Sequence, residues 1–338
     1  MKSKKLTITL IVLDICVFIG FFLTYGPFDY FRNLLITTSM TTMEHQYLAK
    51  IFYGPKTISK VLNSNYVVPN KEEIKLDDII LGSDISEKDS YSSIYEEQIF
   101  KRDEGNTTYK IIPINEYRYK GYLTVIYDPA NVKLAVPSQL GRYGETVAKM
   151  CKNNGGLVGI NGGGFEDLDG WGNGSIPYGA IIKDGKLIYT HPGGNGGLIG
   201  FNKEHKMYLT YETPAEAIKK GMRDAVEFGP FLIVNGKPAQ ISGDGGWGVA
   251  PRSVIAQRKD GIVLMLIIDG RNPGYSLGAD LNDLIKLLLR YKAYNAANLD
   301  GGASTTMAVN GKLYNKPYAG GEYGGRTVSN AWIVTKGE

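Results

Sequence analysis

Two stretches of the C-terminal part of the chain decide the fold: residues 262–271 read IVLMLIIDGR, and residues 280–302 read DLNDLIKLLLRYKAYNAANLDGG. The first stretch is an apolar strand that ends at an Asp-Gly turn. In the second, Asp280 can cap a helix over 281–294 with an apolar stripe at helical spacing, and a short strand follows at 296–299. Strand, helix and strand in this order predict one crossover unit.

The residues around this unit alternate between apolar and polar, which is typical of antiparallel strands. A hairpin is expected from 253–257 and 262–268, because Asp260-Gly261 supplies its turn. A capping box at Thr213 predicts a second helix that stops at Gly221. Other short strands are expected at 122–127, 132–136, 180–182, 187–189 and 231–234. The predicted fold class is therefore α+β, with a mixed, mainly antiparallel sheet and a few packed helices.

Composition and polarity divide the chain into three parts. With 338 residues, 43% of them hydrophobic and 21% charged, the chain is not disordered throughout, and a net charge of +4 is too small to indicate nucleic acid as a partner. We expect a cytoplasmic tip and transmembrane anchor over residues 1–25. A membrane-proximal stalk and polar linker would follow over 26–107, and the compact domain over 108–338.

The apolar run at residues 6–23 is long enough to cross a bilayer core of about 30 Å. Asp14 opposes insertion, but thirteen Leu, Ile, Val and Phe residues outweigh it. Lys2, Lys4 and Lys5 precede the run, so the positive-inside rule keeps the N-terminus in the cytoplasm and the rest of the chain outside. A cleaved signal peptide is the alternative, although no A-x-A site follows the run.

The cysteines and histidines are too few and too scattered for a typical metal site. Cys16 and Cys151 form no CxxC pair, and the three histidines lie far apart in the sequence. No cofactor is therefore expected to be required. Clustered aspartates and carbonyls could still hold Ca²⁺ or Mg²⁺, although no EF-hand spacing is present.

Four segments share one form, in which an apolar strand ends and a polar residue meets glycine: 159–165, 251–253, 268–271 and 299–306. If the strands before Asp269 and Asp300 are neighbours, both carboxylates lie at the same sheet edge. Two carboxylates near two guanidiniums suit chemistry on a charged sugar ester, since arginines hold phosphate and an acid protonates the leaving oxygen. The alternative is structural, because Asp-Gly is a common turn and Arg252 can pair with Asp269.

These segments, with others, resemble the phosphodiester glycosidase family. The matching motifs are Asn161-Gly-Gly-Gly-Phe165, Gly229-Pro-Phe-Leu-Ile-Val-Asn-Gly236, Pro251-Arg-Ser-Val254, Asp269-Gly-Arg271, Leu299-Asp-Gly-Gly-Ala-Ser-Thr-Thr-Met307 and Gly325-Arg-Thr-Val-Ser-Asn-Ala331. Their order and spacing agree with the family pattern from about residue 120 to the end. Three positions depart from it: Gly164 replaces an aromatic residue, Ala303 a glycine and Gly325 an acidic residue that Glu322 lies close enough to replace.

The resemblance implies hydrolysis of a sugar-1-phosphodiester at the glycosidic C–O bond. We predict Asp300 and Asp269 as the catalytic pair, Arg252 and Arg271 as phosphate ligands, and Asn161 and Ser304 as ligands of sugar hydroxyls. Trp171 or Tyr178 could stack on a sugar. The other predicted substrate-binding residues are Gly163, Phe165, Gly301, Gly302, Thr305, Arg326 and Asn330.

The expected substrate is a phosphate-linked glycan of the cell surface or an exopolysaccharide, because the predicted domain lies outside an anchoring membrane. Two other functions stay open. The chain could be a non-catalytic glycan-binding or polysaccharide-assembly protein, which the three departures from the family pattern favour. It could also be a metal-dependent phosphodiesterase that cleaves P–O, although histidines are lacking near the aspartates.

Overall fold

The computed structural model describes residues 2–42, 44–82, 90–167, 172–194, 196–319 and 325–337. It divides into two compact units. The smaller consists of Met1–Tyr66 with Ser242–Gly248, and the larger of Val67–Ile241 with Val249–Glu338. Every motif of the sequence analysis belongs to the larger unit.

The smaller unit is helical, with α1 (Lys2–Tyr25), α2 (Asp29–Met40), α3 (Gln46–Phe52) and α4 (Pro55–Ser64). Over Lys4–Tyr25, α1 is long and apolar enough to cross a membrane, and its side chains are not buried. The other three helices enclose a small apolar core of Ile36, Ala49, Tyr53, Ile58 and Val61. The predicted stalk is thus a packed helical cluster.

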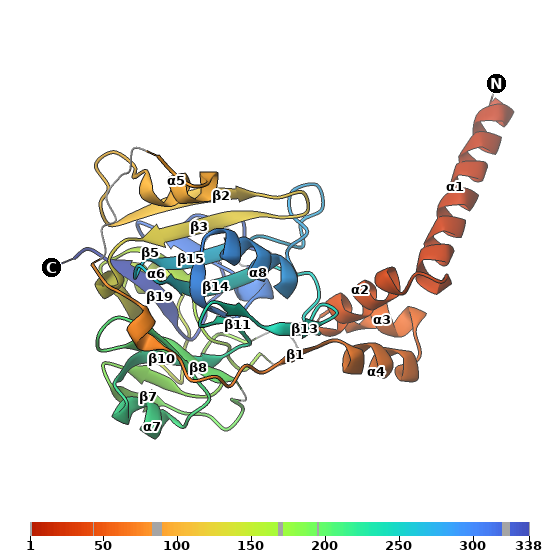
Figure 1. The fold of residues 1–338 in the computed structure, drawn as a ribbon. Helices are drawn as coiled ribbons and strands as arrows, with labels where there is room; N and C mark the ends of the chain where they lie inside the picture. The colour runs from red at the N-terminus through yellow and green to blue at the C-terminus, as the bar shows by residue number, and fades with distance from the viewer. Residues whose placement is uncertain are drawn as a thin grey trace. The chain divides into compact units, whose positions relative to one another are not determined.

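Three sheets of the larger unit are built from antiparallel pairs wherever the register of the described strands is defined. The seven-stranded sheet has the order β12 (Lys237–Pro238), β11 (Phe231–Val234), β16 (Ala293–Asn298), β14 (Arg252–Arg258), β15 (Val263–Ile268), β3 (Lys120–Ile126) and β2 (Tyr109–Asn115). The helix α8 (Leu281–Arg290) packs against β11 and β16 (Figure 1).

The two other large sheets have five strands each. One has the order β7 (Lys186–Tyr189), β6 (Ile181–Lys183), β10 (Met222–Phe228), β8 (Gly197–Asn202) and β9 (Met207–Thr210). The other has the order β18 (Lys312–Leu313), β17 (Met307–Val309), β5 (Gly156–Asn161), β19 (Ala331–Thr335) and β4 (Val132–Ala135). The remaining elements are β1 (Tyr66–Val68), β13 (Gln240–Ser242), η1 (Leu76–Asp78), α5 (Ile94–Phe100), η2 (Pro129–Asn131), α6 (Val147–Asn153), α7 (Pro214–Lys219) and η4 (Gly302–Ser304).

One apolar core unites the three sheets. It contains Ile267 of the seven-stranded sheet, Phe201 of one five-stranded sheet and Trp332 of the other, all fully buried. The rings of Phe201 and Trp332 meet edge to face, with their centroids 5.6 Å apart. The α+β fold class is therefore confirmed, and the loops at the sheet edges extend from a rigid base.

The crossover unit is confirmed, with two differences in detail. The helix ends at Arg290 rather than Tyr294, because Lys292 has a φ of +58° that no helix continues through. The strands β15 and β16 are not neighbours, since both pair with β14, which lies between them. Because each pairing is antiparallel, β15 and β16 run in the same direction and still end at the same edge.

The polar stretch before residue 108 is part of the larger unit, which begins at Val67, whereas the sequence predicted a linker there. The Lys75 backbone N–H donates to Asn235 Oδ1 at 2.9 Å, and the Tyr291 hydroxyl donates to Gln98 Oε1 at 2.7 Å. Buried apolar side chains attach the extension as well (Ile74, Ile79, Ile99 and Phe100). They are too widely spaced within a polar stretch to form a periodic pattern that the sequence analysis could use.

Candidate active site

One edge of the seven-stranded sheet gathers the predicted chemistry. Arg252 begins β14 opposite Ile268, the last residue of β15, so Asp269 follows at that edge. At the same edge Val254 pairs with Asn298, the last residue of β16, two residues before Asp300. Alternating strand directions therefore bring both aspartates and Arg252 to one end of three adjacent strands.

Asp300 is the carboxyl group with the most unusual protonation at this edge. Burial by the surrounding protein raises its pKa to about 6. Hydrogen bonds from the Ser304 side chain and the Gly301 backbone favour the anion and lower the pKa, but burial outweighs them. The positive charge of Arg326 lowers this pKa and the negative charge of Asp167 raises it. A carboxyl group with such a pKa exchanges a proton near neutral pH.

Asp167 is a second carboxylate of this cluster, and the sequence analysis did not select it. Arg326 Nη1 donates to Asp167 Oδ2 at 2.7 Å, and Nη2 donates to Asp167 Oδ1 and, at 2.9 Å, to the Gly172 carbonyl. Burial raises the pKa of Asp167, but the hydrogen bonds from Arg326 and Gly172 outweigh it, so the net pKa lies below the usual value. The sequence signal that could have pointed to Asp167 is its position just after the Asn161–Phe165 motif.

The environments of Asp300 and Asp167 therefore shift the two pKa values in opposite directions. At pH 7, Asp167 is ionised, while about a tenth of the Asp300 carboxyl groups are protonated, and this share rises to about half at pH 6. Pairs of carboxyl groups separated in this way divide the roles of acid and anion in enzymes.

Arginine side chains flank the turn that follows Asp300. A Cβ atom placed on Gly301 would lie 3.7 Å from Arg252 Nη1, and one on Gly302 would lie 3.2 Å from Arg271 Nη2. Gly302 also has a φ of +60°, which favours glycine. The turn is partly exposed and has two guanidinium groups beside it, and Arg326 adds a third cation near Asp300. This edge is therefore suited to a phosphate group.

Asn161 holds the loops of the site together. Its side-chain amide donates to the Asp300 carbonyl at 2.7 Å, while its Oδ1 accepts from the Ser253 hydroxyl at 2.7 Å and the Thr306 backbone N–H at 3.1 Å. Only 1% of Asn161 is exposed. This geometry positions Asp300, whereas the sequence analysis expected Asn161 to bind a sugar hydroxyl.

Several other predicted ligands are also buried beneath the site. Asn330 accepts a 2.7 Å hydrogen bond from the Gly163 backbone N–H, and the Phe165 ring lies 4.9 Å below the Arg326 guanidinium. Ser304 touches the Asp300 carboxyl group from a buried position. The predicted residues that keep some exposure are Arg271, Asp300, Gly301, Gly302 and Arg326, whereas Gly163, Phe165, Arg252, Ser304, Thr305 and Asn330 are buried.

Asp269, the other predicted catalytic residue, has both carboxylate oxygens occupied by the protein. Oδ2 accepts from the Tyr275 hydroxyl at 3.0 Å, and Oδ1 accepts from the Asn315 amide at 2.8 Å and the Lys316 backbone N–H at 3.2 Å. The residue is 1% exposed, and this burial raises its pKa despite the three donors. Asn315 also donates to the Thr305 carbonyl, so Asp269 braces the loop that carries Asp300.

The positions that depart from the family pattern have local explanations in part. Gly325 has a φ of +85°, and a Cβ there would lie 2.7 Å from Thr306 Oγ1, so the backbone favours glycine. At Gly164 a Cβ would lie 2.8 Å from the Phe228 ring.

Of the two aromatic residues expected to stack on a sugar, Tyr178 is exposed and lies beside His191, with ring centroids 5.9 Å apart. Trp171 and Glu322 lie outside the described residues.

Metal ligands are not clustered in the part of the chain that the structure describes. Among those residues, no three His, Cys, Asp or Glu side chains come close enough to hold an ion together. The positive charge at the described site comes from arginines.

Parts of the chain are similar to known proteins. A family model described as phosphodiester glycosidase matches residues 154–335, just over half of the chain. The uncharacterized SPbeta prophage-derived protein YomE of Bacillus subtilis (strain 168) is 36% identical over 180 residues, which are 51% of this chain and 27% of that protein. The N-acetylglucosamine-1-phosphodiester alpha-N-acetylglucosaminidase of Bos taurus is 23% identical over 189 residues, which are 51% of this chain and 34% of that enzyme.

A solved structure shares the fold. The zebrafish N-acetylglucosamine-1-phosphodiester alpha-N-acetylglucosaminidase catalytic domain, auto-inhibited by its pro-peptide, superposes with a TM-score of 0.57 at 21% identity, covering 70% of this chain and 86% of that one. The chain belongs to the phosphodiester glycosidase family. It spans about a quarter to a third of the length of the two sequence relatives.

Proposed function

We propose that this protein hydrolyses the glycosidic C–O bond of a sugar-1-phosphodiester, with Asp300 as the general acid. The observation that carries the proposal is the pair of carboxyl groups with opposed pKa shifts, Asp300 and Asp167, beside the arginine-flanked Gly301–Gly302 turn. Family membership supports the class of reaction.

In the proposed reaction, Arg271 and Arg326 orient the phosphate while Asp300 gives its proton to the oxygen between the anomeric carbon and phosphorus. A phosphate monoester has its second pKa near 6, so the proton donor and the leaving group are matched. The C–O bond breaks as the leaving oxygen takes the proton, and the ionised Asp167 holds Arg326 in position, because both its oxygens accept hydrogen bonds from that guanidinium. Water then adds its oxygen to the anomeric carbon and returns a proton to Asp300.

A panel of sugar-1-phosphodiesters tests the proposal. Free sugar together with an intact phosphate monoester is the expected pair of products. Sugar phosphate together with a free alcohol would instead identify a phosphodiesterase, and no turnover across the panel would favour a glycan-binding protein.

The rate should depend on the protonation of Asp300. Because the acid form donates the proton and its pKa is about 6, turnover should fall as the pH rises through 6. The measurement is the pH profile of kcat from pH 4 to 9 on the best substrate of the panel. Turnover that falls instead as the pH drops through 6 would assign Asp300 the role of base or nucleophile and contradict its role as acid.

We further propose that the reaction requires no metal, because the arginines supply the positive charge that phosphate needs. Treatment with EDTA should therefore leave turnover unchanged. A loss of turnover that Ca²⁺ or Mg²⁺ restores would contradict this part of the proposal.

We also propose that α1 is a single-pass anchor with its N-terminus in the cytoplasm and the larger unit outside. Its hydropathy and the three lysines at its start support this orientation. A surface location suggests a phosphate-linked cell-surface or exopolysaccharide glycan as substrate. A topology reporter fused after residue 60 should report an external position, and a cytoplasmic signal would refute the orientation.

A further inference from the structure

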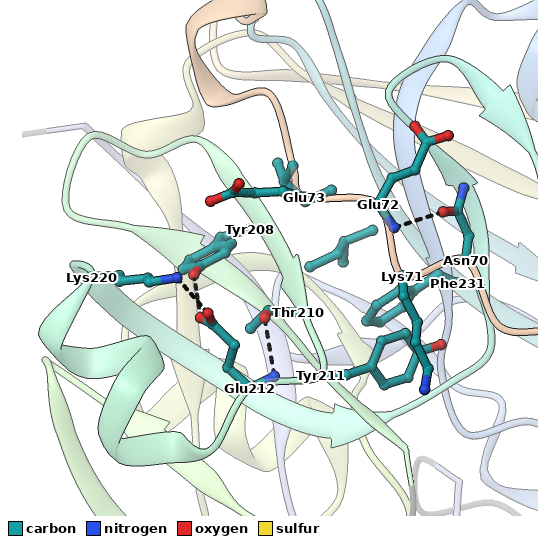
Figure 2. A pocket seen from close by; sticks show the side chains of 12 residues that line it. Asn70, Lys71, Glu72, Glu73, Tyr208, Thr210, Tyr211, Glu212, Lys220 and Phe231 are labelled. Atoms are coloured by element: carbon teal, nitrogen blue, oxygen red, sulfur yellow. Dashed lines mark hydrogen bonds and ion pairs between the residues drawn. The ribbon is translucent and has the colours of Figure 1, made fainter.

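The larger unit has a cavity of about 480 Å³ that shares no lining residue with the Asp300 site. Its walls are residues 70–74 of the N-terminal extension and residues 208–212 of β9 and the turn after it, with Lys220 and Phe231. Figure 2 shows these side chains around the cavity. Its volume lies within the range of small-molecule sites.

An aromatic side chain offers a surface to this cavity. Tyr211 packs on Phe231, with ring centroids 4.6 Å apart and an angle of 37° between the rings (Figure 2). Phe231 is 3% exposed, whereas Tyr211 is 40% exposed. The buried Phe231 ring therefore fixes the position of the partly exposed Tyr211 ring, so a ligand that packs against Tyr211 loses little side-chain entropy on binding. The apolar C–H face of a pyranose is a complementary partner for such a ring.

Polar groups lie around this ring and can serve sugar hydroxyls. The Tyr208 hydroxyl donates to Glu212 at 2.9 Å, and Lys220 pairs with the same carboxylate, so Glu212 is held in place. Among the described residues, Glu73 has no ion pair, and its carboxylate has capacity to accept hydrogen bonds.

The charge of the lining favours an uncharged ligand. Its three carboxylates (Glu72, Glu73 and Glu212) are balanced by three ammonium groups, because Lys71 and Lys220 belong to the lining and Lys237 pairs with Glu72 from outside it. A lining without net charge offers no net attraction to phosphate or uronate groups, whose transfer from water into the cavity would cost free energy. The arginine-flanked site at Asp300 has the opposite character.

We propose that this cavity is a second saccharide site, which binds a neutral pyranose unit with Tyr211 as the stacking platform. One wall comes from residues 70–74, which lie outside the part matched by the family model, so the site is built jointly by the extension and the family domain. The proposal concerns binding alone and does not depend on hydrolysis at Asp300.

The test is a titration of the full-length chain, kept in a detergent without a sugar headgroup, with three trisaccharides followed by ligand-observed NMR. Triacetylchitotriose or maltotriose, which are neutral, should bind at least about tenfold more tightly than trigalacturonate at low salt. Tyr211→Ala should lower the affinity for the neutral trisaccharide by about tenfold, whereas Tyr211→Phe should keep the affinity of the wild type because the ring remains. Tyr117→Ala is the matched control, since Tyr117 is a fully exposed tyrosine outside the cavity lining.

A second variant keeps the test decisive if Tyr211→Ala does not fold. Glu73 is an exposed residue, so Glu73→Lys should fold normally and should reduce the preference for the neutral over the anionic trisaccharide by about threefold or more. The proposal is overturned if neither neutral trisaccharide binds at concentrations up to about 20 mM. It is equally overturned if binding is unchanged in both Tyr211→Ala and Glu73→Lys.

Discussion

Asp300→Asn is expected to lower turnover by about 10²- to 10⁴-fold, because asparagine cannot supply the proton to the leaving oxygen. The side chain keeps nearly the same volume, and its amide oxygen can still accept a hydrogen bond from Ser304 or Gly301, so substrate binding should change much less. Steady-state kinetics on the best sugar-1-phosphodiester measure both quantities, and the effect should appear in kcat.

Thermal melting separates loss of chemistry from loss of fold in this variant. The folded-state pKa of Asp300 is raised, so its ionisation costs stability as the pH rises from about 4 through 6. Asparagine removes that cost, and Asp300→Asn should melt no earlier than the wild type at pH 7.5. Turnover close to that of the wild type would contradict the role of Asp300 as the acid.

Asp269→Asn is expected to act in the opposite way, lowering stability with little change in turnover per folded molecule. The two oxygens of Asp269 accept three hydrogen bonds in a buried position. An asparagine amide would turn its N–H₂ group toward at least one of these donors, which costs about 1–3 kcal/mol in the free energy of unfolding. Chemical denaturation measures the loss.

Asp184→Asn is the matched control for both aspartate variants. The Asp184 side chain is 74% exposed, and its φ of +52° suits asparagine, so neither stability nor turnover should change. A normal unfolding free energy for Asp269→Asn together with a large loss of kcat would instead restore Asp269 to the catalytic pair that the sequence suggested.

Local sequence patterns were sufficient to predict the elements that form the site edge. The apolar run before Asp269, the capped helix from Leu281 and the Asp260-Gly261 turn each depend on neighbouring residues, and all three are present in the structure. The hairpin pairing of β14 with β15 was predicted as well, but the pairing of β14 with β16, which places β14 between the two strands of the crossover unit, is long-range and is not encoded in periodicity.

The roles of the polar residues were harder to predict, because they depend on partners far away in the chain. Asp269 and Asp300 both follow an apolar strand and precede glycine. Asn315 and Lys316 nevertheless donate their hydrogen bonds to the carboxylate of Asp269 and not to that of Asp300. Asp167 meets Arg326 across 159 residues, so no spacing rule indicates this ion pair.

The measurement that tests the central claim most directly is hydrolysis of a sugar-1-phosphodiester in H₂¹⁸O, with both products analysed by mass spectrometry. If Asp300 promotes cleavage of the glycosidic bond, the oxygen of water joins the anomeric carbon. The label is therefore expected in the released sugar, with none in the phosphate monoester. Label in the phosphate product would show cleavage of the P–O bond and contradict the account.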